Sequence, residues 1–596
     1  MITSGTYSFK VLSLISSYSI LINVYVPLII LSSISSNHAA STFSSEVLEI
    51  RSDGNILCDT EEDEVIFENV TTLSPMSRIQ VHVNETIIPP GTEFLVVQVH
   101  TQNFNLSISY NQTLISHFHV NGTNVGLVVP VLRGKTSDVF ITNHNISRNI
   151  SALIAVLAYG KNAPVPGGCN MVASVETAPY LEISYSRSVV RVDVQAPSPP
   201  EDSIETCSFM SVNVEMYHAY LPERDYSSET YFATIQEMLT VNRIRKHAHQ
   251  VRETVEGPKM RRIFSAYPGT GSVYAVIATY EGMNDNYYSA YIPAVTYACS
   301  TMSWADSCEV LTSTFAKLLC AIIFFVGLFV CFLGQRLFQP QVFIHSFFLG
   351  GLISYIVFSG FLQIGLYVST LTVAFTVAVT SMFFWRSVGW PLLHIMIVYL
   401  NLGFLMASVI FFAGLGDFYL MESDINYWSS FAILVLLFPM VTTCFSKKIC
   451  IIAGAILGAF AVIVPIDHYI GSNLKFILLN TVRRATVPEF KYAVINPPYG
   501  DRDLALTATW IVLSLIGMGI QSALQYNRPP YPPPPSNFCC CQLRWPSHRQ
   551  QLGERTPLLV DARIPSRTPP DGYDDVFEPS RSPSAPSSNL LFPRRA

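Results

Sequence analysis

Four ionisable side chains within the strongly apolar segment 311–525 are the first candidates for chemistry. They are His345, His394, Asp467 and His468. A charge within a membrane is costly, so an ionisable residue there is a candidate for moving protons or ions. The structural alternative is that these side chains hydrogen-bond between helices or reach the polar interface from a helix end. A transporter predicts that Asp467 or His468 is buried beside a cavity.

Histidines in the first half of the chain are candidates for a metal site. His117 and His119 would share one face of a strand, and His82 could lie opposite them. Two imidazoles placed in this way can bind a metal ion, but spacing supplies no third ligand. His247 and His249 lie in a basic stretch that a solvated helix face explains. We therefore predict exposed histidines, with no metal and no cofactor.

Motifs of the common enzyme classes are absent from the sequence. There is no Walker loop, no Gly-x-Ser-x-Gly and no His-Glu-x-x-His. The tripeptide 385–387 is Trp-Arg-Ser, where a classical G-protein-coupled receptor carries Asp/Glu-Arg-Tyr. The sequence Asn-Pro-Pro-Tyr, at 496–499, precedes the last apolar segment instead of ending it. We predict a non-enzymatic protein with no catalytic residue, and a membrane hydrolase is the weakest hypothesis.

Cysteines are the next chemically distinctive residues. Residues 41–310 contain Cys58, Cys169, Cys207, Cys299 and Cys308. The number is odd, so at least one of them is free or pairs with another chain. A disulfide between Cys299 and Cys308 would close a small loop, and Cys169 with Cys207 is the second candidate pair. Spacing alone proves neither. Four further cysteines fall in or beside apolar segments and are predicted core residues: Cys320, Cys331, Cys444 and Cys450.

Asn-x-Ser/Thr sequons cluster in one part of the chain, between residues 69 and 151. They occur at Asn69, Asn84, Asn105, Asn111, Asn121, Asn145 and Asn149. A cluster confined to one segment predicts a glycosylated surface outside the cytosol. The alternative is that Asn-rich turns produce sequons by chance.

The N-terminus has the pattern of a secretory signal. Lys10 precedes an apolar run, 11–31, and small residues end at Ala40. We predict a signal peptide over residues 1–40. An uncleaved signal anchor is the alternative, and it would deliver the following residues to the same side of the membrane.

Composition divides the rest of the chain into parts. Of the 596 residues, 50% are hydrophobic and 13% are charged, about half the charged share of soluble domains. Residues 41–310 have the composition of a secreted protein, and 526–596 are rich in Pro, Ser and Arg. The net charge of −6 is small, so no nucleic-acid partner is expected.

The secreted part predicts two mostly-β units. Short alternating runs such as 94–99 and 106–110, separated by Gly, Pro and Asn, indicate a β-sandwich over residues 41–185. A second β or α+β unit is expected over residues 186–310. It contains strand-like runs and a helical stretch, 228–252, with apolar residues near helical spacing.

The apolar part predicts an all-α bundle of seven transmembrane helices over residues 311–525. Each segment is long enough to cross a bilayer core of about 30 Å. The segments are 312–333, 341–361, 364–384, 389–412, 428–446, 449–469 and 503–525. With the secreted part outside, Arg336, Arg386, Lys447 and Lys448 fall in cytosolic turns, in agreement with the positive-inside rule.

One connection, 470–502, conflicts with this topology because it is basic. We predict an amphipathic helix that lies in the outer membrane interface, with apolar residues on one face and most of its cations on the other. The alternative is a six-helix protein with this connection inside. The cations are Lys475, Arg483, Arg484, Lys491 and Arg502.

The C-terminal part, 526–596, is predicted to be a disordered cytosolic tail. A proline-rich run precedes Cys539, Cys540 and Cys541, which are candidates for palmitoylation. Two short patterns are candidates for sorting by adaptor proteins, through an acidic dileucine and a Tyr-x-x-apolar motif. Their anchoring residues are Glu554, Leu558, Leu559, Tyr573 and Val576.

Three stretches carry a resemblance to a known family. They are PVPGGCN at 164–170, AYIPAVTYACS at 290–300 and GERTPLL at 553–559. With the order of secreted part, seven helices and tail, they resemble the transmembrane-7 superfamily member 3 family. The resemblance implies roles in cell survival, in protein homeostasis under stress and in secretory cells, including insulin secretion and negative regulation of apoptosis. It implies no catalytic residue.

These observations leave three hypotheses. The first is a non-enzymatic membrane protein that supports stress resistance and signalling, with an unknown protein or glycan ligand at its ectodomain. The second is a transporter or channel, and the third is the hydrolase. The expected surroundings are membrane lipids, in the plasma membrane or endolysosomal membranes.

Overall fold

The computed structural model describes residues 44–49, 63–83, 87–112, 119–131, 137–169, 181–200, 207, 212–253, 260–282, 286–302, 308, 314–362, 365–389, 391–442 and 446–526. Several predicted features lie outside these residues. They are the signal peptide, the tail with its palmitoylation and sorting candidates, Cys58, Asn84, His117 and Cys444.

Strands β1 to β9 form a first β-sandwich. One sheet has the order β1-β3-β8-β5-β6, and the other has the order β2-β9-β4-β7. Side chains of β3 alternate between buried and partly exposed, as expected for a strand with one face on a core. The strands are β1 (Ser44–Glu49), β2 (Glu64–Leu73), β3 (Ser77–Val83), β4 (Thr92–His100), β5 (Leu106–Ser109), β6 (His119–Gly122), β7 (Asn124–Pro130), β8 (Ser137–Thr142) and β9 (Ile150–Gly160).

A second β-sandwich follows in the chain. Its sheets have the orders β10-β11-β14-β18 and β13-β12-β15-β16, with β17 beside β15. The boundary predicted after residue 185 would separate β10 from β11, with which β10 pairs. The strands are β10 (Leu181–Tyr185), β11 (Val189–Val194), β12 (Val212–Tyr220), β13 (His249–Gln250), β14 (Arg261–Ser265), β15 (Ser272–Glu281), β16 (Asn286–Ala290), β17 (Ala294–Thr296) and β18 (Ala493–Val494).

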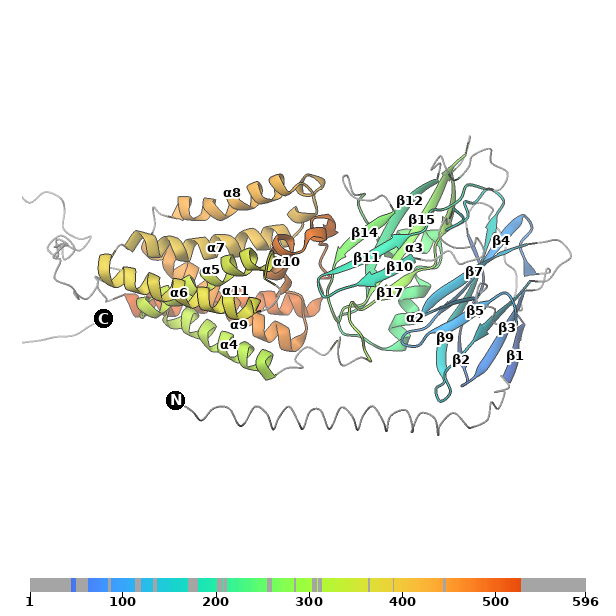
Figure 1. Cartoon of the computed structure of the whole chain (residues 1–596), viewed down its shortest axis with the longest axis horizontal. Coiled ribbons are helices and arrows are strands. Elements are labelled where there is room, and N and C mark those ends of the chain that lie inside the picture. The colour runs from blue at the N-terminus through green and yellow to red at the C-terminus, as the bar shows by residue number, and fades with distance from the viewer. Residues whose placement is uncertain are drawn as a thin grey trace, which may run out of the picture. The chain divides into compact units, whose positions relative to one another are not determined.

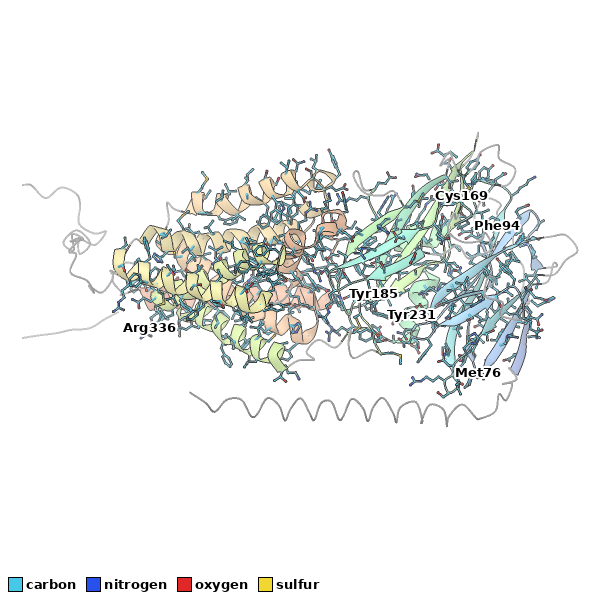
Figure 2. The ribbon with its side chains drawn as sticks, viewed as in Figure 1. Met76, Phe94, Cys169, Tyr185, Tyr231 and Arg336 are labelled. Atoms are coloured by element: carbon cyan, nitrogen blue, oxygen red, sulfur yellow. A yellow bond between two sulfur atoms is a disulfide. The ribbon has the colours of Figure 1, made fainter. Side chains whose placement is uncertain are left out.

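Two short helices pack between the sandwiches (Figure 1). They are α2, Ser228–Gln236, and α3, Val241–His247, so the predicted helical stretch is broken near Thr240, which caps α3. The apolar side chains of both helices share one core with β4 and β9 of the first sandwich and β15 of the second. Phe94 and Tyr231 belong to this core (Figure 2). This shared core joins the two sandwiches, because separating them would expose it to water.

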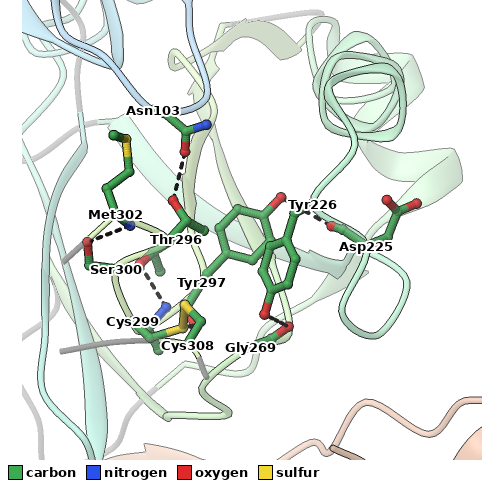
Figure 3. The surroundings of a disulfide bond; sticks show 12 residues. Asn103, Asp225, Tyr226, Gly269, Thr296, Tyr297, Cys299, Ser300, Met302 and Cys308 are labelled. Atoms are coloured by element: carbon green, nitrogen blue, oxygen red, sulfur yellow. Dashed lines mark hydrogen bonds between the residues drawn. A yellow bond between two sulfur atoms is a disulfide. The ribbon is translucent and has the colours of Figure 1, made fainter. Parts of the chain in front are cut away.

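Both predicted disulfides are present in the second sandwich region. Cys169 pairs with Cys207, and Cys299 pairs with Cys308. Figure 3 shows the second bond beside Tyr226 and Tyr297, whose ring centroids lie 5.2 Å apart. The short loop that it closes directly precedes the first long helix.

Seven helices of the described residues are long and apolar enough to cross a membrane, as predicted. The helices α7 and α9 are the most buried of them, and α9 packs against α4, α7 and α11. The peripheral α8 packs mainly on α7 (Figure 1). The seven are α4 (Thr314–Leu333), α5 (Phe338–Ser359), α6 (Leu366–Val388), α7 (Pro391–Phe412), α8 (Asp424–Thr442), α9 (Ser446–Ile470) and α11 (Asp501–Gln525).

Glycines allow α4 and α9 to approach at backbone distance. A Cβ added to Gly327 of α4 would lie 2.8 Å from the backbone nitrogen of Val462. A Cβ added to Gly458 of α9 would lie within 3.0 Å of the backbone of Cys331. Lipid provides no hydrophobic driving force between helices. Small residues let the two backbones pack closely, and this van der Waals contact stabilises the crossing.

We predict that Gly458→Val destabilises the bundle by about 1–3 kcal/mol, because the new side chain meets backbone that cannot rotate away. Thermal unfolding of the detergent-solubilised protein measures the change. The control is Gly519→Ala in α11, where an added Cβ meets nothing within 4 Å. Equal unfolding temperatures for the two variants would contradict the close packing of α4 and α9.

Candidate functional site at the junction of sandwich and helices

The connection between α9 and α11 joins the second sandwich to the helices. It contains a helix, α10 (Phe476–Thr486), a 3-10 helix, η6 (Pro488–Tyr492), and β18. Strand β18 pairs in parallel with β14, and Phe264 is the partner of Val494. The connection therefore lies on the same side of the bundle as the sandwich. This excludes the six-helix alternative, because α9 must end and α11 must begin on that side.

The predicted amphipathic helix is present as α10, but its two arginines are buried. Arg483 and Arg484 are only 5% and 9% exposed, so these cations do not face water. The apolar face of α10 is also covered by protein, since Phe476 and Ile477 share a core with Tyr267 of the sandwich. The amphipathic pattern was identified correctly, but the second sandwich covers the polar face and supplies hydrogen-bond acceptors to it.

Arg483 is the main polar link from α10 to the second sandwich. Its Nη1 donates to the backbone oxygen of Ala266 at 2.9 Å and to Ser265 Oγ at 3.2 Å. Its Nη2 donates to the backbone oxygen of Arg187 at 2.6 Å. The guanidinium also lies 4.9 Å from the ring centroid of Phe476. Burial lowers its pKa to about 10, so the group stays charged at neutral pH and its hydrogen bonds are charge-assisted.

Arg484 extends from α10 toward the start of α8. Its Nη2 donates to the backbone oxygens of Met421 and Glu422, at 3.1 and 3.0 Å, and to Asp424 Oδ1 at 2.8 Å. Burial lowers the pKa of this guanidinium, and the carboxylate of Asp424 opposes the shift. Adjacent arginines thus bind α10 to the sandwich and to the helical bundle.

Asp417 holds the next part of the connection. Its carboxylate accepts hydrogen bonds from the backbone nitrogens of Ile495 and Asn496, at 2.7 and 2.8 Å. The carbonyl oxygens of the same two residues accept from the hydroxyls of Tyr267 and Tyr220, at 2.5 and 2.8 Å. The backbone after β18 is therefore held from both sides. Sequence reasoning missed Asp417, which carried no signal beyond its position before an apolar segment.

Asp467, a predicted intramembrane candidate, has a structural role. Its side chain is fully buried, and it accepts hydrogen bonds from the Ser472 hydroxyl and from the backbone nitrogens of Leu474 and Lys475. The ammonium of Lys475 lies 3.3 Å from the same carboxylate. These contacts close the turn after α9 and occupy both carboxylate oxygens. His468 is half-buried.

A pair of carboxyl groups lies at the start of α11. Asp503 accepts from the backbone nitrogen of Asn473 at 2.7 Å, and the Asn473 amide lies 3.4 Å from Glu223 Oε1. Burial and a hydrogen bond to Asp503 raise the pKa of Glu223 to about 8. Its Oε2 is buried and no donor reaches it, so the neutral, protonated form is favoured there. Glu223 and Asp503 both contact Asn473, which places the loop after β12 beside the start of α11.

The other two intramembrane candidates lie near the opposite end of the bundle. His345 Nδ1 is 3.4 Å from the Asn401 amide, and His394 Nε2 is 3.1 Å from the backbone oxygen of Ser381. Both rings are buried. The four predicted residues therefore do not form one site.

The histidines of the first half do not form a metal centre among the described residues. His82 Nδ1 lies 2.7 Å from Asp138 Oδ1, and His119 is half-buried on β6. His247 ends α3 and His249 lies on β13, and both are exposed, so only His247 belongs to the predicted helix face. No group of three His, Cys, Asp or Glu side chains in the described ranges is placed to hold a metal ion.

The sequon asparagines are spread over the first sandwich. Glycosylation itself remains a prediction, although their exposure makes most of them accessible. Asn145 is half-buried, and the exposed ones are Asn69, Asn105, Asn111, Asn121 and Asn149.

Three families match successive parts of the chain. Residues 60–159 match "TM7SF3-like, N-terminal immunoglobulin-like domain", and residues 164–302 match "TM7SF3-like, second immunoglobulin-like domain". Residues 320–522 match "TM7S3/TM198-like domain". The two sandwiches are therefore similar to immunoglobulin-like domains, and the matches follow the division into sheets and helices.

Curated relatives match over most of their length. Transmembrane 7 superfamily member 3 of Homo sapiens is 29% identical over 462 residues, which is 75% of this chain and 80% of the relative. The protein of that name from Rattus norvegicus is 28% identical, over 75% of this chain and 81% of the relative. That from Mus musculus is 27% identical, over 77% and 82%.

We predict that Arg483→Met destabilises the folded protein by on the order of 3 kcal/mol, since it leaves buried carbonyl oxygens without donors. Arg483→Lys should recover part of the loss, because an ammonium keeps the charge but not the fork of donors. Thermal unfolding in detergent measures both. The control, Lys246→Met, removes an exposed cation of α3. A loss no larger than that of the control would show that the Arg483 contacts contribute nothing to stability.

A second prediction concerns pH. The pKa of Glu223 is about 8 in the folded protein against an ordinary 4.5, so the folded state keeps a proton that the unfolded chain releases. The resulting stabilisation is complete below about pH 4.5 and is lost as the pH rises through about 8. The unfolding temperature should therefore be higher at acidic than at alkaline pH within this window.

Glu223→Gln should reduce this dependence, because the amide mimics the protonated acid. The matched control is Glu229→Gln, at an exposed position of α2. Identical pH profiles for the wild type and Glu223→Gln would contradict the role of this carboxyl group.

Proposed function

Since the chain belongs to the transmembrane 7 superfamily member 3 family, we propose that it is a non-enzymatic, seven-pass membrane protein that supports cell survival, protein homeostasis under stress and signalling in secretory cells. The membrane character and the seven helices are established by the family and by the structure. The cellular role is what the family resemblance implies.

We call the contacts between the connection 471–500 and the second immunoglobulin-like domain the junction. These contacts are the observation that supports a signalling role. The connection 471–500 is bound to the second immunoglobulin-like domain by β18 and Arg483, and it is covalently continuous with α9 and α11. A ligand that shifts this domain would therefore shift the ends of two packed helices. Transmission needs a mechanically continuous path with more than one arrangement, and buried hydrogen bonds provide the continuity.

The proposed ligand is a protein or a glycan at the ectodomain. Six of the seven sequon asparagines are described, and all six lie on the first immunoglobulin-like domain, so attached sugars would leave the second domain free for contacts. The candidate sorting motifs of the tail would bind adaptor proteins. These features support placement in the plasma membrane or endolysosomal membranes.

A transporter or channel is the second candidate function. Asp467 does not favour it, because its carboxylate is occupied by the turn after α9. Gln341, His345 and Asn401 do favour it, since they are buried between the helices and retain polar atoms without partners.

The experiment uses cells that lack the protein and are placed under secretory-pathway stress. We expect wild-type protein and Lys246→Met to restore survival, and Arg483→Met to restore less at equal surface amounts, because the junction is weakened. Failure of the wild type to change survival would overturn the proposed role. Full rescue by Arg483→Met would overturn the role of the junction in it.

Proximity labelling from the ectodomain, in the same cells, identifies the ligand. A labelled partner that is lost when the second domain is altered at exposed residues supports ligand binding. Labelling that is unchanged by every such alteration contradicts it.

A further inference from the structure

Several buried polar atoms between the helices have no hydrogen-bond partner. Gln341 is fully buried, and neither its Oε1 nor its Nε2 is bonded. His345 and Asn401 are 5% and 2% exposed, and His345 Nε2 and Asn401 Oδ1 are likewise unbonded. Gln335 Nε2 is a further such atom. Unsatisfied polar groups are rare in native interiors because each one loses the hydrogen bonds that it makes with water in the unfolded chain.

These side chains lie together in the half of the bundle remote from the immunoglobulin-like domains. Gln341 and His345 are one turn apart on α5, so they share a face of that helix. Asn401 of α7 donates to the backbone oxygen of His345 at 3.0 Å. A Cβ added to Gly454 of α9 would lie 3.1 Å from Gln341 Nε2. Three helices therefore meet around these amides and the imidazole.

Gln521, near the end of α11, borders these side chains on one side. Gln521 Nε2 donates to the backbone oxygens of Val330 and Cys331, at 3.1 and 2.6 Å. Its Oε1 accepts from the backbone nitrogen of Gln335 at 3.4 Å. Gln521 is thus satisfied by the last turn of α4 and by the turn that follows it, and it does not satisfy Gln341.

Reorienting the side-chain amides does not give the unbonded atoms hydrogen-bond partners. Rotating Gln341 by 180° exchanges two unbonded atoms. Rotating Asn401 would place its oxygen against the carbonyl of His345 and break the bond at 3.0 Å. With Asn401 Nδ2 facing His345 Nδ1 at 3.4 Å, Nδ1 acts as the acceptor and the ring proton belongs on Nε2, the unbonded atom.

The chemistry of the unbonded atoms defines the ligand. The group offers amide and imidazole donors together with amide acceptors, and none of Gln335, Gln341 and Asn401 carries a charge. A neutral molecule that both donates and accepts fits this set, and buried water typically makes about three such bonds. A metal cation would meet donor hydrogens as well as oxygens.

We propose that Gln341, His345 and Asn401 form a hydrated site that binds water, reached from the end of the bundle remote from the immunoglobulin-like domains. Gln335 marks the approach, because it is next to the exposed Arg336 in the turn between α4 and α5 (Figure 2). Toward the domains, the buried Leu405 lies one turn beyond Asn401 on α7.

Hydroxyl-radical footprinting of the wild-type protein in detergent tests this proposal without any substitution. Radicals formed from bound water oxidise the side chains beside it. The comparison is between two buried histidines, His345 and His394, which are 5% and 1% exposed. We expect His345 to be oxidised at least several-fold faster than His394. Equal, slow oxidation of both would overturn the site.

Cysteine substitution gives an independent test in the full chain with its other free cysteines replaced. A thiol reacts with a charged, membrane-impermeant reagent only where water allows it to ionise. We expect Asn401→Cys to react when the reagent is supplied on the side remote from the domains. Ala378→Cys, at a fully buried position of α6, is the dry control. If a correctly folded Asn401→Cys protein reacts no faster than this control, the hydrated site is contradicted.

Discussion

The burial of the Arg483 guanidinium between α10 and the second immunoglobulin-like domain is the interaction on which this arrangement depends. A guanidinium leaves water only if its donors find acceptors, and here the backbone oxygens of Ala266 and Arg187 supply them. Neither element satisfies this group by itself. The domain and the helix therefore stabilise each other, and the pairing of β18 with β14 extends the same contact.

This coupling matters because the ectodomain is itself cohesive. The helices α2 and α3 share a core with sheets of both immunoglobulin-like domains, so the two domains are joined by apolar packing. The junction then joins the second domain to α9 and α11. The ectodomain is thus joined to α9 and α11 by buried contacts.

Polar side chains have different roles at the two ends of the bundle. Near the domains, Asp467 is satisfied by backbone nitrogens and by Lys475, so its burial stabilises a turn. At the remote end, Gln341 is equally buried but unbonded. The difference lies in the partners and not in the burial. The polar groups near the domains therefore stabilise the fold. Those at the remote end retain unused hydrogen-bonding capacity.

The sequence by itself determined the order of β units and seven helices, since periodicity and hydrophobic length are local properties of the chain. It also identified the disulfide pairs as candidates and the amphipathic face of α10. Only the tertiary structure decided what covers that face, because the acceptors for Arg483 lie more than 200 residues away in the chain. The same reason explains why Asp417 and Glu223 went unnoticed and why Asp467 proved structural: a side chain's role depends on partners that spacing along the sequence does not reveal.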